Sequence, residues 1–351
     1  MFPYWLMFAF FATGALSQQA RTYGPSTSRP LLVLAACVMA LMIGLRFEVG
    51  PDWLSYVWMY EAAGRTDFAS AIAHSDPGFF TLLWLISGFR VEIWLVNIVC
   101  AAIFVTGLIS FARQQPNPWL AATVAVPYLV IVIAMSGTRQ ATAIGFILLA
   151  LAAFSQRRLF KFMFWVIFAS LFHASALLML IIVGLSYTRN RFQALVLLGI
   201  SAFPAYLILS ASFETYIRRY TDINLQSEGT IYRVLMNFIP ALILLFNIDK
   251  FVTERHDRTL WRNISILSLL CLPILFVVPS STALDRVTLY LIPIQLFALS
   301  RIPSVFSSNS RNYSLYCLAV IIYLAAIMFV YLNYSTHGQY YIPYQVYPLF
   351  D

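Results

Sequence analysis

Long runs of apolar residues, separated by short polar connections, follow one another along the whole chain. Runs of this kind are typical of helices that cross a membrane, because such helices satisfy their own backbone hydrogen bonds. Several are shorter than the ~20 residues that cross a bilayer, so we expect flanking residues to complete them. The pattern predicts about ten spans, near 2–17, 30–45, 91–111, 119–136, 138–154, 192–210, 231–248, 263–278, 286–300 and 313–333.

Two further apolar stretches do not fit a single span. Residues 79–89 are too few to cross a bilayer, so they are predicted to form a half-helix on the outer side. Residues 160–187 are too many for one span and too few for two, so we expect a hairpin of two short helices. The predicted fold is an all-α, polytopic membrane helix bundle, with residues 1–351 as one transmembrane domain.

Composition agrees with a membrane protein and excludes several other classes. Hydrophobic residues make up 61% of the chain and charged residues only 10%, against about a quarter in soluble domains. No basic residue precedes the first apolar run, so we interpret 2–17 as a span and not as a cleaved signal peptide. The four cysteines lie far apart in apolar runs, which indicates neither disulfides nor a metal site. No cofactor is expected.

The distribution of charge sets the expected orientation. With the N-terminus outside and 160–187 as a hairpin, the outer side receives eight arginines and eleven carboxylates, and both termini are outside. Counting 160–187 as one span would move the basic groups near 250–262 and 301–311 outside, against the positive-inside rule. With the hairpin, fourteen cations face the cytoplasm: Arg21, Arg29, Arg113, Arg157, Arg158, Lys161, Arg189, Arg191, Lys250, Arg255, Arg258, Arg262, Arg301 and Arg311.

This topology also accounts for the net charge of +8. The surplus lies in short cytoplasmic loops, so we do not expect nucleic-acid binding. The predicted cytoplasmic loops are near 17–29, 155–161, 249–262 and 301–312. The predicted outer loops are near 46–78 and 211–230.

Every outer cation is an arginine, whose planar fork of donors suits phosphate and carboxylate groups. The chain favours arginine in general, which is the simpler explanation of their identity. That preference does not explain why Arg46, Arg139 and Arg286 stand at the ends of apolar runs. A charge there is costly unless it lines a cavity or meets a ligand. These positions are therefore candidates for binding an anion.

Polar clusters surround these arginines. In the segment 46–56, Gly50 and Pro51 are expected to end one helix and begin another, with Asp52 in the first turn and Tyr56 on its face. Residues 136–140 place Arg139 at a helix start, which is a natural anion site. His173 stands between two serines at the expected hairpin tip, as either a packing residue or a functional one. Asp285 and Arg286 are adjacent, which a structural ion pair also explains.

Six short motifs follow one another along the chain: R-x-x-V-G-x-D-x-x-x-Y at 46–56, D-P-G-F at 76–79, S-x-x-R-Q at 136–140, F-H-A-S-A at 172–176, D-R-x-x-x-Y at 285–290 and an aromatic tail at 340–344. These motifs resemble those of the EpsG family, bacterial inner-membrane proteins of polysaccharide synthesis that are related to the Wzy O-antigen polymerases. The resemblance covers almost the whole chain in the expected order. One position departs from the family pattern, because glutamate is expected where Asp76 stands.

The resemblance implies that the chain polymerises oligosaccharide repeat units carried on undecaprenyl diphosphate, at the periplasmic face. A chain-length regulator and a flippase of the same pathway are possible partners. Arginines, rather than a divalent ion, are expected to stabilise the leaving diphosphate. Trp53, Tyr56, Tyr60, Tyr340, Tyr341 and Tyr344 would line a glycan vestibule. The candidate ligands of the diphosphate and glycan are Arg46, Arg139, Gln140, Arg233, Arg286, Tyr56 and Glu48.

Transfer of a glycan to a sugar hydroxyl requires a base, and the candidates are His173, Asp52 and, third, Glu48. We expect Asp52 to stay ionised near Arg46 and to orient a partner, whereas His173 in apolar surroundings is neutral and able to accept a proton. Other activities stay open. An O-antigen ligase or a polyprenyl-linked glycosyltransferase would use similar arginines, and a flippase would carry charges along a path through the membrane.

Overall fold

The computed structural model describes residues 1–18, 29–186, 229–277 and 281–347 of the chain. Two short strands in these residues, β1 (Arg46–Phe47) and β2 (Gln345–Val346), pair in antiparallel register. The helices are α1 (Phe2–Ser17), α2 (Arg29–Gly44), α3 (Trp53–Ala63), α4 (Phe68–Ile72), α5 (Pro77–Ser87), α6 (Trp94–Ala112), α7 (Pro118–Ala125), η1 (Val126–Ala134), α8 (Thr138–Ser155), α9 (Leu159–Phe172), η2 (Ala174–Leu177), α10 (Leu178–Ser186), α13 (Thr230–Phe246), α14 (Ile248–Phe251), α15 (Arg255–Leu275), α16 (Ser281–Leu291), α17 (Pro293–Phe306), α18 (Ser310–Tyr334) and η3 (Gly338–Tyr341).

The prediction of an all-α membrane bundle is confirmed, but ten full spans are not. In the described residues, four helical stretches are long and apolar enough to cross a membrane: Trp94–Ala112, Thr138–Ser155, Leu284–Phe306 and Ser310–Tyr334. The other apolar helices have 10–17 residues. The predicted span 192–210 lies outside the described residues. The predicted half-helix at 79–89 is α5, an 11-residue helix.

Three differences from the predicted boundaries have physical causes. The predicted span 119–136 is α7 followed by the π-helix η1, whose wider turn an apolar pattern does not reveal. The predicted span 286–300 lies in α16 and α17, which meet at Pro293, the first residue of α17. The helix α15 begins at Arg255, inside the predicted loop 249–262, because this polar stretch continues the helix beyond its apolar part.

The helices α6 and α8 pack through glycine and form the centre of the bundle. A Cβ added at Gly107 of α6 would lie 2.0 Å from the carbonyl oxygen of Gly145 in α8. The two backbones therefore touch, as they do where small residues meet in membrane helices. The helix α8 is buried on almost all sides, whereas α18 is largely exposed and lies at the edge.

The segment 160–187 has both of its ends on one side of the bundle. Before α9, Arg157 forms an ion pair with Glu254, the residue that precedes α15, at 2.7 Å. At the end of α10, the Ser186 hydroxyl accepts a hydrogen bond from Asn263 of α15 at 2.9 Å. Both contacts involve the first part of α15, so α9 and α10 lead away from this side and back to it, as a hairpin does.

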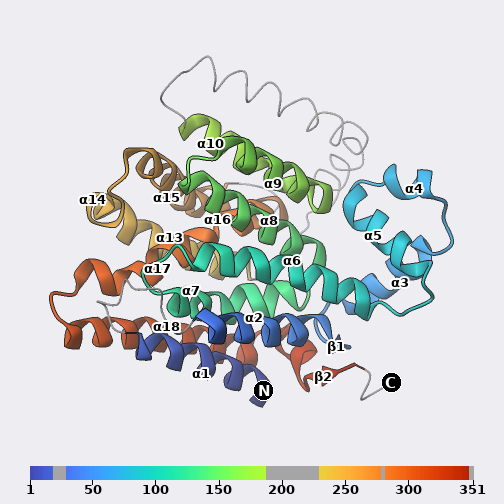
Figure 1. Ribbon diagram of the computed structural model, residues 1–351, viewed down its shortest axis with the longest axis horizontal. Helices are drawn as coiled ribbons and strands as arrows, with labels where there is room; N and C mark the ends of the chain where they lie inside the picture. The colour runs from blue at the N-terminus through green and yellow to red at the C-terminus, as the bar shows by residue number, and fades with distance from the viewer. Residues whose placement is uncertain (19–28, 187–228, 278–280, 348–351) are drawn as a thin grey trace.

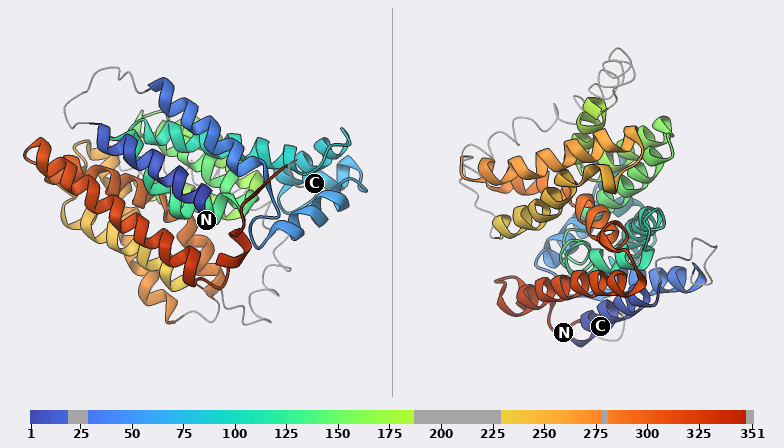
Figure 2. Two further views of the ribbon diagram at one scale, coloured as in Figure 1. Left: turned by 90° about the horizontal axis from the view of Figure 1, so that it is seen from below. Right: turned by 90° about the vertical axis from the view of Figure 1, so that its left-hand side faces the viewer.

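The two ends of the bundle differ in character (Figure 1). The helices α3, α4 and α5 stand beside the bundle at one end, which we call the α3 end, and α14 lies at the opposite end, the α14 end. In Figure 2, α1 and α18 lie on one side of the molecule and α10 and α15 on the other, with α7 and α17 between them. The β1–β2 pair lies near the α3 end.

Candidate active site

A glycine turn brings the segment after α2 against the start of α8. Gly50 has a φ of 97°, and its N–H donates to the carbonyl of Tyr340 at 2.8 Å. A Cβ at this position would lie 2.2 Å from the carbonyl oxygen of Met135. Only glycine combines this conformation with such a close approach. The turn therefore fixes Asp52 beside the residues that open α8.

Asp52 is the N-cap of α3 and not a residue of its first turn, as the sequence predicted. The helix starts two residues later because Pro51 and Asp52 form the turn that precedes it. The Asp52 carboxylate does not cap α3; it accepts a hydrogen bond from the Ser136 hydroxyl at 2.8 Å. Tyr56 is buried, and its hydroxyl accepts a hydrogen bond from the backbone N–H of Arg139 at 3.4 Å.

Arg139 forms an ion pair with Asp76, the residue that precedes α5. Nη1 of Arg139 lies 2.6 Å from Oδ2 of Asp76. The guanidinium also lies about 6 Å from the ring centroids of Tyr56 and Phe79, within the range of a cation–π contact. Nε of Arg139 and Oδ1 of Asp76 have no hydrogen-bond partner among the described residues. Each side chain therefore keeps one unused polar atom.

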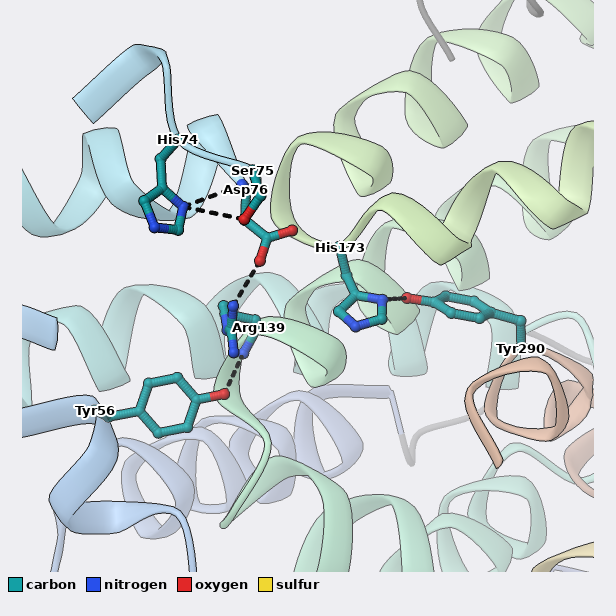
Figure 3. A network of polar contacts seen from close by, with 7 residues as sticks. All are labelled: Tyr56, His74, Ser75, Asp76, Arg139, His173 and Tyr290. Carbon is teal, nitrogen blue, oxygen red and sulfur yellow. Dashed lines mark hydrogen bonds and ion pairs between the residues drawn. The ribbon is translucent and has the colours of Figure 1, made fainter. Parts of the chain in front are cut away.

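Asp76 is 3% exposed, so its carboxyl group lies in a poorly hydrated place. Burial raises the pKa of the Asp76 carboxyl above its usual value, and the Arg139 guanidinium opposes that rise. His74 stacks on Phe80, and its Nδ1 lies 3.2 Å from the Ser75 hydroxyl. These contacts hold the short loop that carries Asp76 over the start of α8 (Figure 3).

His173 stands at the break between α9 and η2, with an extended backbone. Its N–H donates to the carbonyl of Ala169 and its carbonyl accepts from the N–H of Ala176, both at 3.0 Å. Nδ1 of the imidazole lies 3.0 Å from the hydroxyl of Tyr290 in α16. His173 and Tyr290 are both buried. In Figure 3 the imidazole lies between Tyr290 on one side and Arg139 on the other.

Two further arginines, Arg233 in α13 and Arg286 in α16, belong to the region of Asp76 and His173. Arg286 acts electrostatically on both Asp76 and His173, so its charge belongs to the same group. Arg233 forms a close ion pair with Asp285. The adjacent pair Asp285–Arg286 is therefore not an isolated ion pair: its carboxylate binds α13, while its arginine faces Asp76 and His173.

Arg46 is buried, with 1% of its surface exposed. Its Nη1 donates to the carbonyl of Ile43 and its Nη2 to the hydroxyl of Thr138, both at 2.8 Å. This arginine links the end of α2 to the start of α8. Glu48 is exposed, with a φ of 51°, and Gln140 is half-buried next to Arg139.

The structure therefore gathers Asp52, Tyr56, Arg139, His173 and Arg286 from four separate segments. Asp76 and Tyr290 lie in the same place, although neither was among the ligands and catalytic groups predicted from the sequence. Both were visible as members of short motifs, D-P-G-F and D-R-x-x-x-Y, but the motifs do not show which side chains meet. Among the described residues, no three His, Cys, Asp or Glu side chains group as metal ligands.

The tyrosines predicted to line a glycan vestibule differ in their surroundings: three of them bind backbone carbonyls, and one is exposed. The Tyr341 and Tyr344 hydroxyls donate to the carbonyls of Val132 and Met42, at 3.1 and 2.8 Å, and so fasten the C-terminal tail to the bundle. The Tyr60 hydroxyl donates to the carbonyl of Val91. Only Tyr340 is a largely exposed ring among the tail tyrosines.

Comparison with known proteins gives one result. The model of the EpsG family matches residues 30–346, which is nearly the whole chain and includes every segment of the site. Neither the curated proteins nor the solved structures contain a significant match. The chain is therefore a member of the EpsG family.

Proposed function

We propose that this protein is a polysaccharide polymerase, which joins oligosaccharide repeat units carried on undecaprenyl diphosphate at the periplasmic face of a bacterial inner membrane. Family membership supports a polymerase. The observation that carries the proposal is the group of Arg139, Arg286, Asp76 and His173 at the α3 end. This group contains cations for a diphosphate and a base for a hydroxyl, and it needs no metal ion.

Arg139 and Arg286 are assigned to the diphosphate. Arg139 stands in the first turn of α8, at the positive end of the helix dipole, which favours an anion. Its side chain is 27% exposed, so a ligand can reach it. Gln140 follows it in α8, and Arg233 supports the group through Asp285. Arg46 is assigned to holding the turn that positions Asp52 and Thr138, because its Nη1 and Nη2 already donate to groups of the protein.

The reaction forms a bond between a hydroxyl oxygen of the acceptor sugar and the anomeric carbon of the donor glycan. The bond between that carbon and the phosphate oxygen breaks, and its electron pair leaves with undecaprenyl diphosphate. His173 takes the hydroxyl proton on Nε2, and the arginines stabilise the negative charge of the leaving group. Asp52 orients the turn at Ser136, and Tyr56 and Glu48 are assigned to contacts with the glycan.

An O-antigen ligase or another polyprenyl-linked glycosyltransferase would use the same cations, and a flippase would act on the same lipid-linked glycan. Deletion of the gene, followed by electrophoresis of the surface polysaccharide, separates these activities. A polymerase deletion leaves surface glycolipid with single repeat units, and the long polymer returns when the gene is restored. Accumulation of lipid-linked polymer inside the cell would instead show a ligase. Complete loss of surface repeats would show a flippase.

A further inference from the structure

Within the described part of the chain, Tyr290 is the side chain that forms a hydrogen bond with the imidazole of His173. Its hydroxyl lies 3.0 Å from Nδ1, and the two residues are 117 positions apart in the chain. Tyr290 is 1% exposed and His173 is 6% exposed. A buried contact between segments so distant in sequence connects η2 to α16 at the centre of the candidate site.

The backbone of His173 is fixed by its own hydrogen bonds, to Ala169 and Ala176. The remaining freedom of this residue is the rotation of its ring and the choice of the nitrogen that carries the proton. A neutral imidazole has one donor and one acceptor nitrogen, and the partner of one nitrogen decides the role of the other. Nδ1 is occupied by Tyr290, and no hydrogen bond to Nε2 is found among the described residues. Nε2 is thus the atom available to a substrate.

The surrounding charges decide which nitrogen carries the proton. The groups that face His173 are Tyr290 and Arg286 on α16, Arg139 on α8 and Asp76 beside Arg139. Tyr290 and Arg139 lie on opposite sides of the ring (Figure 3). Arg139 and Arg286 offer hydrogen-bond donors and positive charge. Beside them, Nε2 is more stable with a free lone pair than with a proton. The proton then lies on Nδ1 and is donated to the Tyr290 oxygen.

We infer that Tyr290 is a positioning residue, which accepts a hydrogen bond from Nδ1 of His173 and so leaves Nε2 as the base for the acceptor hydroxyl. This inference rests on the proposed function, because it assigns the base of that reaction. The same contact stabilises the imidazolium that forms when Nε2 takes the proton, since Nδ1–H keeps its acceptor throughout the step.

Tyr290→Phe tests this role, with Tyr313→Phe as the matched control. Tyr313 is also buried, and its hydroxyl accepts a hydrogen bond from Asn117 at 3.1 Å, far from the site in α18. Membranes are prepared from a deletion strain that accumulates lipid-linked single repeats, and polymer formation is measured against pH. Wild-type activity in this assay tests the proposed function first. Absence of polymer with the wild-type protein would reject that function, independently of Tyr290.

With an active wild type, Tyr290→Phe is expected to reduce kcat by about tenfold with little change in KM, which corresponds to the loss of one hydrogen bond. The acid limb of the kcat profile is expected to move to lower pH, because the imidazolium loses an acceptor. Tyr313→Phe should keep the wild-type profile. A Tyr290→Phe profile of unchanged position, at any level of activity, would overturn the inference.

A second measurement tests the inference on the wild-type protein, in case Tyr290→Phe folds poorly. In wild-type protein labelled with ¹⁵N-histidine, solid-state nitrogen shifts report the tautomer of each ring, and His173→Gln identifies the signal of His173. The expected signal is a protonated Nδ1. A protonated Nε2 in the wild-type protein would overturn the inference without any variant of Tyr290.

Discussion

At the residue scale, the central feature of the site is a buried carboxylate in an ion pair with an arginine. Asp76 is 3% exposed, and its Oδ2 lies 2.6 Å from Nη1 of Arg139. Removing one member of a buried ion pair leaves the other charge without its partner, which lowers the free energy of unfolding by several kcal/mol. Arg139 therefore has a structural role at the same position where we assign it to the diphosphate.

Arg139→Gln is predicted to lower the free energy of unfolding by about 3 kcal/mol at neutral pH. Without the guanidinium, the pKa of Asp76 rises further above its unfolded value, because Arg139 no longer opposes the effect of burial. A raised pKa in the folded state means that stability is present at low pH and is lost as pH rises through that value. Thermal unfolding in detergent should therefore show a deficit that is larger at pH 8 than at pH 5.

The double variant Asp76→Asn/Arg139→Gln provides the control, because it removes both charges. Its stability should recover towards wild type and should lose the added dependence on pH, while polymer formation stays absent. If the single and double variants unfolded alike at both pH values, the ion pair would have no part in stability.

Sequence analysis found the polar residues of this site but not their partners. Arg139 and His173 were recognisable because each interrupts an apolar stretch, where a polar group is costly. Their partners Asp76 and Tyr290 lie 63 and 117 positions away, and nothing in the local pattern identifies them. Arg46 carried the same signal, and Nη1 and Nη2 of its guanidinium bind Ile43 and Thr138 within the protein, so its assignment as a ligand stays a prediction.

At the scale of elements, α8 carries Arg139 and must be held in register with α6. The close approach of Gly107 to Gly145 allows this, and an extra methyl group has no room. Gly107→Ala is predicted to destabilise the protein by about 1–3 kcal/mol, as over-packing does, and to shift α8 and its arginine. Thermal unfolding and polymer formation should both fall.

Gly88→Ala is the matched control for that substitution. Gly88 also has an ordinary helical φ, but an added Cβ would come no closer than 3.4 Å to the carbonyl oxygen of Leu85. This variant should unfold and function like the wild type. Equal loss of stability in Gly88→Ala and Gly107→Ala would indicate a general effect of replacing glycine and not a contact between α6 and α8.

Apolar runs predicted the presence of helices better than their lengths. The first span agreed with α1 at both ends, because a polar segment follows it directly. The start of α3 was predicted two residues too early, because proline is accepted both in a helix and in the turn before it. The π-helix η1 and the junction of α16 and α17 depend on packing against other helices, which no local pattern contains.

At the scale of the molecule, charged side chains from distant loops meet at the α14 end. Arg157 pairs with Glu254, Arg258 pairs with Asp249, and Arg301 donates to the carbonyl of Phe251. Loops that the positive-inside rule assigns to the cytoplasm thus lie together. The sequence predicted this grouping through charge counting alone, and it required the hairpin at 160–187.

The orientation of the bundle in the membrane is a prediction that labelling can test. In a background without Cys37, Cys100, Cys271 and Cys317, single cysteines replace the exposed residues Ser70, Arg158 and Ser308. A thiol reagent that does not cross the membrane is expected to label the Ser70 variant in intact spheroplasts. The Arg158 and Ser308 variants should be labelled only after the membrane is opened, because basic loops stay in the cytoplasm. Labelling of Arg158→Cys from outside would place the site of Arg139 and His173 on the cytoplasmic face, where the proposed periplasmic polymerisation cannot occur.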